Sequence, residues 1–325
     1  MINRRCLIAC AAAPLLLGGT TTLWAQAGDF PARPITLVAP FPAGSVTDAV
    51  TRVLANALTQ SLGKPVLVDN RAGAQGTIGA AYVAKAKPDG YTLLVGSSVM
   101  FVANSLFKEL PYDPVKSFEA VANVGSTSMM FLVPMASPYK TIGDLTAAQR
   151  SARQAVSMAY GSPSGQVAVA LFASMTQSEP IAVAYRGIPQ AITDMIGGQV
   201  QVAVVDIGSG LTQVNGQKAR ALAISSGARY EGAPDVPTLQ EALPRANGTL
   251  ETLIAVMAPA GTPAPVVAKL DAAIREAMAT TPIKAHFQAL NTKVMPMASK
   301  QLDARIAMDN PRWEALIKKA GMAPQ

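Results

Sequence analysis

The chain has 325 residues, of which 50% are hydrophobic and 14% charged, and its formal net charge is +7. This composition is typical of a globular protein and excludes an intrinsically disordered one. At about 150 residues per domain, the length predicts two domains. The basic residues form no block and few aromatic residues accompany them. Nucleic-acid binding is therefore not expected, whereas an anionic small ligand is compatible with the charge.

The N-terminal segment has the features of an export signal. Arg4 and Arg5 precede an apolar stretch at 7–17, and the small residues Ala25 and Ala27 define a cleavage site. We predict a signal peptide at 1–27, cleavage after Ala27 and a periplasmic mature protein. Loss of the two arginines lowers the formal charge from +7 to +5. The apolar stretch is shorter than the ~20 residues that span a bilayer.

Two other interpretations of this segment remain open. Residues 7–10 resemble a lipoprotein box ending at Cys10, although only four residues separate this cysteine from Arg5. The Arg4-Arg5 pair resembles a twin-arginine export signal that lacks the usual polar flanks. Cys6 and Cys10 are the only cysteines, so the mature protein is expected to have no thiol and no disulfide.

In the rest of the chain, apolar runs alternate with helical periodicity. A first series predicts strands at 35–39, 66–68 and 91–95 and helices at 48–60 and 77–85. A second series predicts strands at 129–133, 156–159, 183–184, 200–205 and 221–225 and helices at 166–175, 189–196 and 209–215. A strand at 253–258, a helix at 263–279 and a helical C-terminal stretch follow. This alternation is typical of α/β folds with parallel strands.

The two series predict two α/β lobes. Crossing strands near 127–133 and 249–257 would join them, which makes the first lobe discontinuous. We expect lobe 1 to comprise 28–129 and 251–325, and lobe 2 to comprise 130–250. Ligands commonly bind in the cleft that such an arrangement leaves.

The residues give little support for catalysis. His286 is the only histidine and belongs to a predicted C-terminal helix. The segment 161–165 resembles a nucleophile elbow but has Pro163 where that motif requires serine. One histidine and no mature cysteine do not make a usual structural zinc site. We therefore predict a protein that is not an enzyme and has no metal and no cofactor.

The glycines at 73–79 approach a dinucleotide-binding fingerprint. Their spacing, Gly-x-x-Gly-x-x-Gly, differs from the Gly-x-Gly-x-x-Gly of that motif. An exported protein would also meet little nicotinamide cofactor. We interpret the segment as a tight turn from a strand into a helix, in which glycine permits close backbone approach.

Small glycine-bearing loops that lead from a strand into a helix recur at 41–48, 161–165 and 186–189. Each presents backbone N–H groups at the positive end of a helix dipole, which suits a carboxylate. Ser45, Thr47, Ser162 and Ser164 would add hydroxyl donors. Helix capping alone explains any one of these loops, but three of them in two predicted lobes favour a binding cleft.

Several short segments resemble one known family over the whole mature chain. They include Arg33-Pro34-Ile35-Thr36-Leu37-Val38, Pro40-Phe41-Pro42-Ala43-Gly44, Asn70-Arg71-Ala72-Gly73-Ala74, Lys87-Pro88-Asp89-Gly90-Tyr91-Thr92-Leu93-Leu94, Leu110-Pro111-Tyr112-Asp113-Pro114, Asp235-Val236-Pro237-Thr238 and Ala258-Pro259-Ala260-Gly261-Thr262-Pro263. Together they are similar to the extracytoplasmic solute receptors of tripartite tricarboxylate transporters, also called Bug receptors.

The resemblance implies a type II-like periplasmic binding protein fold, in which two α/β lobes joined by crossing strands close over a ligand cleft. It implies a monomer that captures a small carboxylate (a di- or tricarboxylate, an acidic amino acid or an aromatic acid) and delivers it to a membrane permease. The ligand-binding positions that match the family pattern are Phe41, Pro42, Ala43, Gly44, Ser45, Thr47, Asp48, Ser97, Ser98, Gly161, Ser162, Ser164, Tyr185, Arg186, Gly187 and Asp206.

The sequence departs from the family pattern where ligand identity is decided. Ser45 replaces the second glycine of the first loop, and Gln166 and Ala170 stand where many members have histidine and glutamate. Arg186 replaces the common lysine and offers a carboxylate a two-point contact. Asp48 and Asp206 would either repel a second carboxylate or hold an ammonium group. A sensor that presents its ligand to a signalling partner and an exported hydrolase are the alternative functions.

Overall fold

The structure is a computed structural model that describes residues 30–151, 155–244 and 248–319. The predicted signal peptide, its cleavage site and both cysteines lie outside the described residues. The strands are β1 (Ile35–Ala39), β2 (Val66–Asn70), β3 (Thr92–Ser97), β4 (Phe118–Pro134), β5 (Ser157–Tyr160), β6 (Ile181–Ala184), β7 (Val202–Asp206), β8 (Ala219–Ile224), β9 (Glu251–Pro259) and β10 (Lys293–Ala298). The α-helices are α1 (Val46–Leu62), α2 (Thr77–Ala84), α3 (Ile142–Ser151), α4 (Pro163–Thr176), α5 (Ile188–Ile196), α6 (Ile207–Asn215), α7 (Leu239–Ala242), α8 (Ala264–Ala279), α9 (Thr281–Ala289) and α10 (Ser299–Lys319). Two 3₁₀ segments are η2 (Ala74–Gly76) and η3 (Ser98–Ser105).

One curled, mixed sheet runs through both lobes, in the order β2-β1-β3-β9-β4-β7-β5-β6. The outer strands are parallel: β2, β1 and β3 in the first lobe, and β7, β5 and β6 in the second. The middle of the sheet is antiparallel, because β9 runs opposite to β3 and β4, and β4 runs opposite to β7. The sequence predicted parallel strands, and this holds on both flanks but not at the centre.

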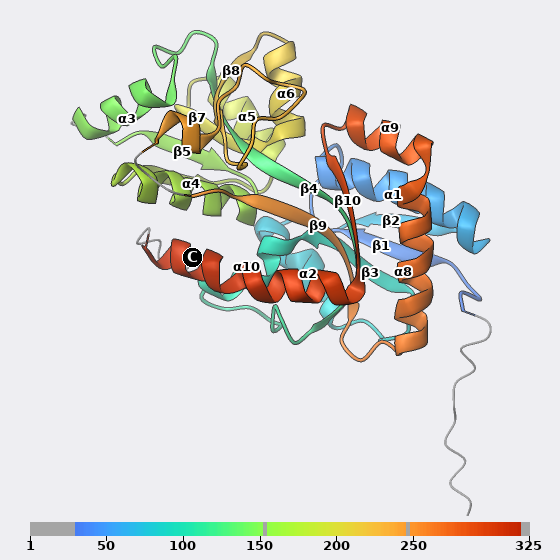
Figure 1. The fold of residues 1–325 in the computed structure, drawn as a ribbon. Helices are drawn as coiled ribbons and strands as arrows, with labels where there is room; N and C mark the ends of the chain where they lie inside the picture. The colour runs from blue at the N-terminus through green and yellow to red at the C-terminus, as the bar shows by residue number, and fades with distance from the viewer. Residues whose placement is uncertain (1–29, 152–154, 245–247, 320–325) are drawn as a thin grey trace, which may run out of the picture.

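Strand β4 belongs to both lobes. Its N-terminal part pairs with β9 and β10 in the first lobe, and its C-terminal part pairs with β7 and β8 in the second. Figure 1 shows β4 and β9 running together from one lobe toward the other. Within the second lobe, alternate β4 side chains point to opposite faces, as a pleated strand requires. Met129 and Phe131 enter one core and Met130 and Leu132 the other.

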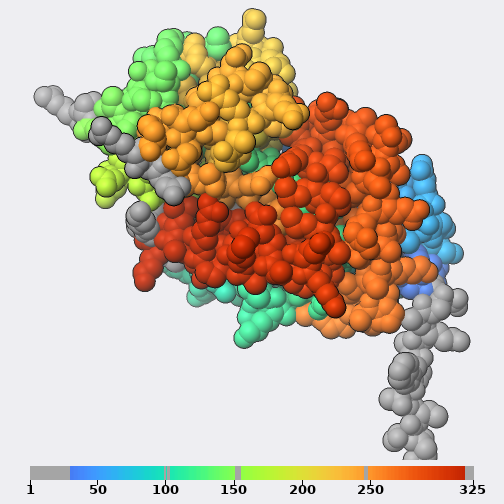
Figure 2. All heavy atoms as spheres, viewed as in Figure 1, coloured from blue at the N-terminus to red at the C-terminus, as the bar shows by residue number. Residues whose placement is uncertain are grey.

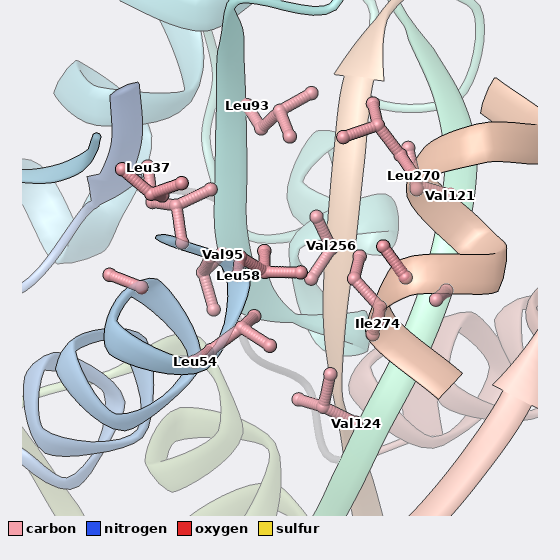
Figure 3. Packing of buried hydrophobic residues seen from close by; sticks show 14 of the residues in the cluster. Leu37, Leu54, Leu58, Leu93, Val95, Val121, Val124, Val256, Leu270 and Ile274 are labelled. Carbon is pink, nitrogen blue, oxygen red and sulfur yellow. The ribbon is translucent and has the colours of Figure 1, made fainter. Parts of the chain in front are cut away.

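Each lobe packs helices on both faces of its part of the sheet. In the first lobe, α1 and α8 cover one face and bury Leu54, Leu58, Leu270 and Ile274 against β1, β3, β4 and β9 (Figure 3). Helices α2 and α10 cover the opposite face. In the second lobe, α3 and α4 lie over one core and α5 and α6 over the other. Buried apolar area on both faces therefore stabilises each half of the sheet.

Helix α10 also connects the two lobes. Its first half buries Leu302 and Ile306 in a first-lobe core, and its second half buries Trp313 and Ile317 in a second-lobe core. Figure 1 shows α10 passing beneath both lobes, and Figure 2 shows it as a continuous red band across this face. The residue limits given above for the lobes stay a prediction. Among the described residues, no helix has the length and apolarity needed to cross a bilayer.

Local sequence explains where helices α1, α4 and α6 begin. Ser45, Ser162 and Asp206 are N-caps whose side chains accept hydrogen bonds from the backbone three residues later. Helix α1 begins at Val46, slightly before the predicted start at residue 48, because Ser45 is its cap. Strand β10 was not predicted, and β4 is much longer than the predicted 129–133. Strand β10 and the additional residues of β4 pair with each other, and β4 also pairs with β9, all in antiparallel orientation.

Trp313→Ala tests whether α10 stabilises the fold through the second-lobe core. Trp313 is 2% exposed, and truncation of a buried tryptophan usually costs about 3–5 kcal/mol. We expect the free energy of unfolding, measured in urea, to fall by about that amount. Met308→Ala on the same helix, where the side chain is 64% exposed, is the matched control and should change it by less than about 0.5 kcal/mol. Equal effects would show that the Trp313 contact contributes little.

Candidate functional site

The loop after β1 is held in place by one carboxylate. Asp48 accepts hydrogen bonds from Gly44 N at 3.0 Å, Asn70 Nδ2 at 2.8 Å and Arg52 Nε at 3.1 Å. Asn70 Nδ2 also donates to Phe41 O at 3.2 Å. Gly44 has a φ of 83°, which glycine adopts without strain. The hydrogen bonds of Asp48 and Asn70 to the backbone of Gly44 and Phe41 therefore fix the conformation of the loop.

Asp48 is a structural carboxylate in this arrangement. Burial raises its pKa, but the hydrogen bonds from Arg52, Gly44 and Asn70 and the charge of Arg52 outweigh burial, so its pKa is lowered. Arg52 also forms an ion pair with it at 3.0 Å. Asp48 is thus ionised at neutral pH and already partnered. It is absent from the lining of the cavity described below.

In the second lobe, the loops before α4 and α5 touch each other through glycine. A Cβ at Gly161 would lie 2.2 Å from Gly187 C and 2.3 Å from Ile188 N, closer than any side chain allows. Ser162 caps α4 by accepting a hydrogen bond from Gly165 N at 3.1 Å. The predicted glycines here therefore serve the close approach of two backbones, which brings both loops to one point.

Three contacts join the lobes around the cleft. Ser97 Oγ and Ser164 Oγ share a hydrogen bond of 2.9 Å. A Cβ at Gly187 would lie 2.8 Å from Pro42 Cγ, and one at Gly208 would lie 2.5 Å from Leu290 O. Ser97 and Pro42 are on the first lobe, and their partners are on the second. The described structure is therefore a closed arrangement of the lobes.

Next to these contacts, a partly open cavity of about 50 Å³ lies between the lobes. Seven of its lining residues carry hydroxyl groups: Ser45, Thr47, Ser97, Thr127, Ser162, Ser164 and Thr252. The others are Phe41, Pro42, Val46, Met129, Ile188, Asp206, Leu253 and Ile254. Asp206 is the only ionisable side chain among these lining residues. A cavity that combines hydroxyl donors with apolar walls suits a small ligand that has both a polar and an apolar part.

Asp206 ends β7 and caps α6. Its Oδ1 accepts a hydrogen bond from Ser209 N at 2.8 Å, and its Oδ2 accepts one from Ser209 Oγ at 3.0 Å. Burial raises its pKa, and these hydrogen bonds oppose the shift without cancelling it. The cavity therefore contains a carboxylate that binds a proton more readily than usual.

Of the predicted ligand-binding residues, the structure brings eight together in the cavity: Phe41, Pro42, Ser45, Thr47, Ser97, Ser162, Ser164 and Asp206. Gly161 and Gly187 lie next to it through their backbone contacts. The lining does not include Ala43, Gly44, Asp48, Ser98, Tyr185 or Arg186. Their part in binding stays a prediction.

Asp48 is described above, and the other five of these residues are placed as follows. Ala43, Gly44 and Arg186 are exposed. Ser98 is buried and accepts a hydrogen bond from Leu253 N at 3.1 Å, which ties η3 to β9. Tyr185 donates a hydrogen bond to Asp194 Oδ2 at 2.8 Å, and burial together with Asp194 raises its pKa.

Sequence reasoning missed the floor of the cavity. Thr127 and Met129 on β4 and Thr252, Leu253 and Ile254 on β9 line it. Thr252 Oγ1 donates a hydrogen bond to Thr127 O at 3.2 Å, which links the two crossing strands beneath the cavity. The predicted crossings near 127–133 and 249–257 contained this signal, because side chains on crossing strands must border the cleft between the lobes.

The geometry of the described residues supports neither a catalytic role for His286 nor a metal site. His286 lies on the exposed face of α9, where its Nδ1 is 2.7 Å from Pro282 O, and it does not line the cavity. Among the described residues, no group of three or more His, Cys, Asp and Glu side chains could hold a metal ion.

Solved structures of similar fold include that of the periplasmic binding protein BugD. MatC of Rhodopseudomonas palustris, solved with bound malate, is 30% identical and superposes with a TM-score of 0.82 over 89% of this chain and 100% of MatC. Another R. palustris protein, solved with adipate, is 27% identical with a TM-score of 0.85 over 91% of this chain and 100% of its own. The fold and the cavity between the lobes thus define a periplasmic binding protein of two α/β lobes.

The family follows from the sequence. Residues 50–322 match the family model described as "Tripartite tricarboxylate transporter family receptor". Protein BugT of Bordetella pertussis is 32% identical over 300 residues, which cover 91% of this chain and 92% of BugT. The chain belongs to this receptor family, as its sequence motifs predicted.

Gly208→Ala tests the closed arrangement. The added Cβ would meet Leu290 O at 2.5 Å and Val46 Cγ2 at 2.9 Å, so the lobes must move apart to accept it. We expect small-angle scattering to show a larger radius of gyration with an unchanged circular dichroism spectrum. Gly143→Ala, whose Cβ would have only an ordinary 3.4 Å contact, is the control and should match the wild type. An unchanged radius for Gly208→Ala would show that the lobes do not depend on this contact.

Asp206→Asn tests the buried carboxylate. The folded pKa of Asp206 is raised above its unfolded value, so its favourable contribution is full only below the unfolded pKa and is lost as pH rises through the folded pKa. Asparagine caps a helix as well as aspartate does. We therefore expect the variant to melt at a higher temperature than the wild type at pH 7, with the difference shrinking toward pH 4. A lower melting temperature at pH 7 would contradict this.

Proposed function

We propose that this protein is a periplasmic receptor that captures a small carboxylate by closure of its lobes and delivers it to the membrane permease of a tripartite tricarboxylate transporter. The observation that carries the proposal is the cavity between the lobes, to which both lobes contribute hydroxyl groups. The ligands of the two R. palustris proteins, malate and adipate, are carboxylates. Export through the signal peptide at 1–27 belongs to the same proposal.

The cavity binds an anion without a basic side chain. Helices α1 and α4 begin at its wall, one from each lobe, with their caps Ser45 and Ser162 in the lining. Helix N-termini carry partial positive charge and unpaired N–H groups that favour carboxylates. Because one helix comes from each lobe, a ligand that contacts both binds the closed form more tightly than the open form. That difference drives closure.

The charge of Asp206 limits how much negative charge the ligand can carry. When it is ionised, it repels a second carboxylate in the cavity; its raised pKa reduces this repulsion as pH falls. Carboxylate affinity should therefore increase from pH 8 toward pH 5. The bound form of the receptor then presents one joined surface of both lobes to the permease.

Binding is tested by thermal shift on the mature protein, residues 28–325, with dicarboxylates, tricarboxylates, acidic amino acids and aromatic acids. A ligand that binds only the native state raises the melting temperature by mass action. Ser164→Ala removes a hydroxyl from the cavity and should weaken the best ligand by about tenfold, as expected for a hydrogen bond to a charged group. Ser61→Ala on the exposed surface of α1 is the control and should leave affinity unchanged.

One result of this experiment would contradict the proposed receptor function. If folded protein, freed of carried-over ligand by unfolding and refolding, gives no shift with any carboxylate, the proposed function is wrong. Delivery is tested separately: cells that lack the receptor should lose uptake of the identified ligand, and Ser164→Ala should restore it only at higher ligand concentration.

A further inference from the structure

A second, larger space lies directly outside the cavity. This outer groove has a volume of about 470 Å³ and is bounded by the start of α1, by α5 and α6, and by residues 289–291. Ser45, Val46 and Ile188 line both spaces. Because the same three residues line both, the cavity and the groove adjoin each other there.

The groove has an apolar side. Ile188, Ile192 and Ile196 all line it from α5, and their spacing of four residues places them on one face of the helix. Ile192 is 7% exposed, whereas Ile196 is 39% exposed. Among the described lining residues, Lys218 is the only ionisable one. The three isoleucines therefore form an apolar track on one face of α5, and Ile188 at its start also lines the cavity.

The two volumes limit which ligands fit the closed protein. A cavity of roughly 150 Å³ holds benzene, whereas the space between the lobes is about 50 Å³. This space accommodates a carboxylate group and little more. A longer carbon skeleton therefore extends past Ser45, Val46 and Ile188, which line both spaces, into the outer groove.

We propose that the ligand is an amphiphilic monocarboxylate, with its carboxylate in the cavity and its apolar tail along the Ile188, Ile192 and Ile196 track of α5. This inference rests on the proposed function and narrows it to one class of carboxylate. Asp206 in the cavity is consistent with it, because a ligand with one carboxylate brings one negative charge to that carboxyl group. Tail length, more than a second charge, then decides affinity.

Calorimetric titration of the mature protein, freed of carried-over ligand, with acetate, butanoate, hexanoate and octanoate tests the proposal. Each methylene that enters the groove should tighten binding by about twofold to fourfold. Ile196→Gln makes the outer end of the track polar. It should weaken octanoate by about threefold to tenfold and leave acetate unchanged. Ile181→Gln is the matched control, because Ile181 is a 49% exposed isoleucine of the same lobe on β6, outside the groove.

The outcomes separate this inference from the receptor function. If affinity is flat or falls with chain length, or if Ile196→Gln and Ile181→Gln have the same effect on octanoate, the tail site is wrong. Tight binding of malate or another short dicarboxylate in the same experiment would leave the receptor function intact. If no carboxylate of either kind binds, both proposals are wrong.

Discussion

The pairing of β4 on both edges, in both lobes, is the constraint on which the rest of the structure depends. A strand that carries β9 and β10 at one end and β7 and β8 at the other cannot leave either lobe without breaking backbone hydrogen bonds. The lobes are therefore fixed at the floor of the cavity. Elsewhere the lobes meet through contacts that involve no shared strand, such as Ser97–Ser164 and Gly208–Leu290. Helix α10 adds a second connection, since its two halves lie in different cores.

The loops around the cavity are held in shape by side chains that hydrogen-bond to their backbone. Asp48, Arg52 and Asn70 hold the first loop from outside the cavity. Gly161 lets the second-lobe loops touch, and Gly187 lets one of them reach Pro42. What remains for a ligand is main-chain N–H and hydroxyl groups at the starts of α1 and α4. This explains why a loop with so little side-chain chemistry follows β1: its function lies in its conformation.

The sequence predicted the helices and strands that have strong local patterns. It did not predict the strands whose formation depends on pairing with distant strands. The flanking strands and the main helices follow from apolar periodicity and from caps such as Ser45 and Ser162. Strand β10 and the first half of β4 were missed because antiparallel pairing with distant strands stabilises them and leaves no local pattern. In the site, the hydroxyl residues of the loops were predictable from their motifs. Thr252 and Leu253 were missed although the predicted crossing at 249–257 contains them, because the sequence does not show which side chains of a crossing strand face the cleft. The hydrogen bonds from Asn70 and Arg52 to Asp48 were also not visible in the sequence.

The lining of the cavity also determines how the protein responds to its surroundings. Among the described residues that line it, none is lysine, arginine or histidine. Dissolved salt weakens binding when it screens mobile surface charges or competes for them, and over about 10 Å it does so strongly at moderate ionic strength. Fixed backbone dipoles inside the cavity offer salt no such target. For the proposed carboxylate, a site of this kind therefore loses less affinity at high ionic strength than a site built from surface lysine or arginine side chains would.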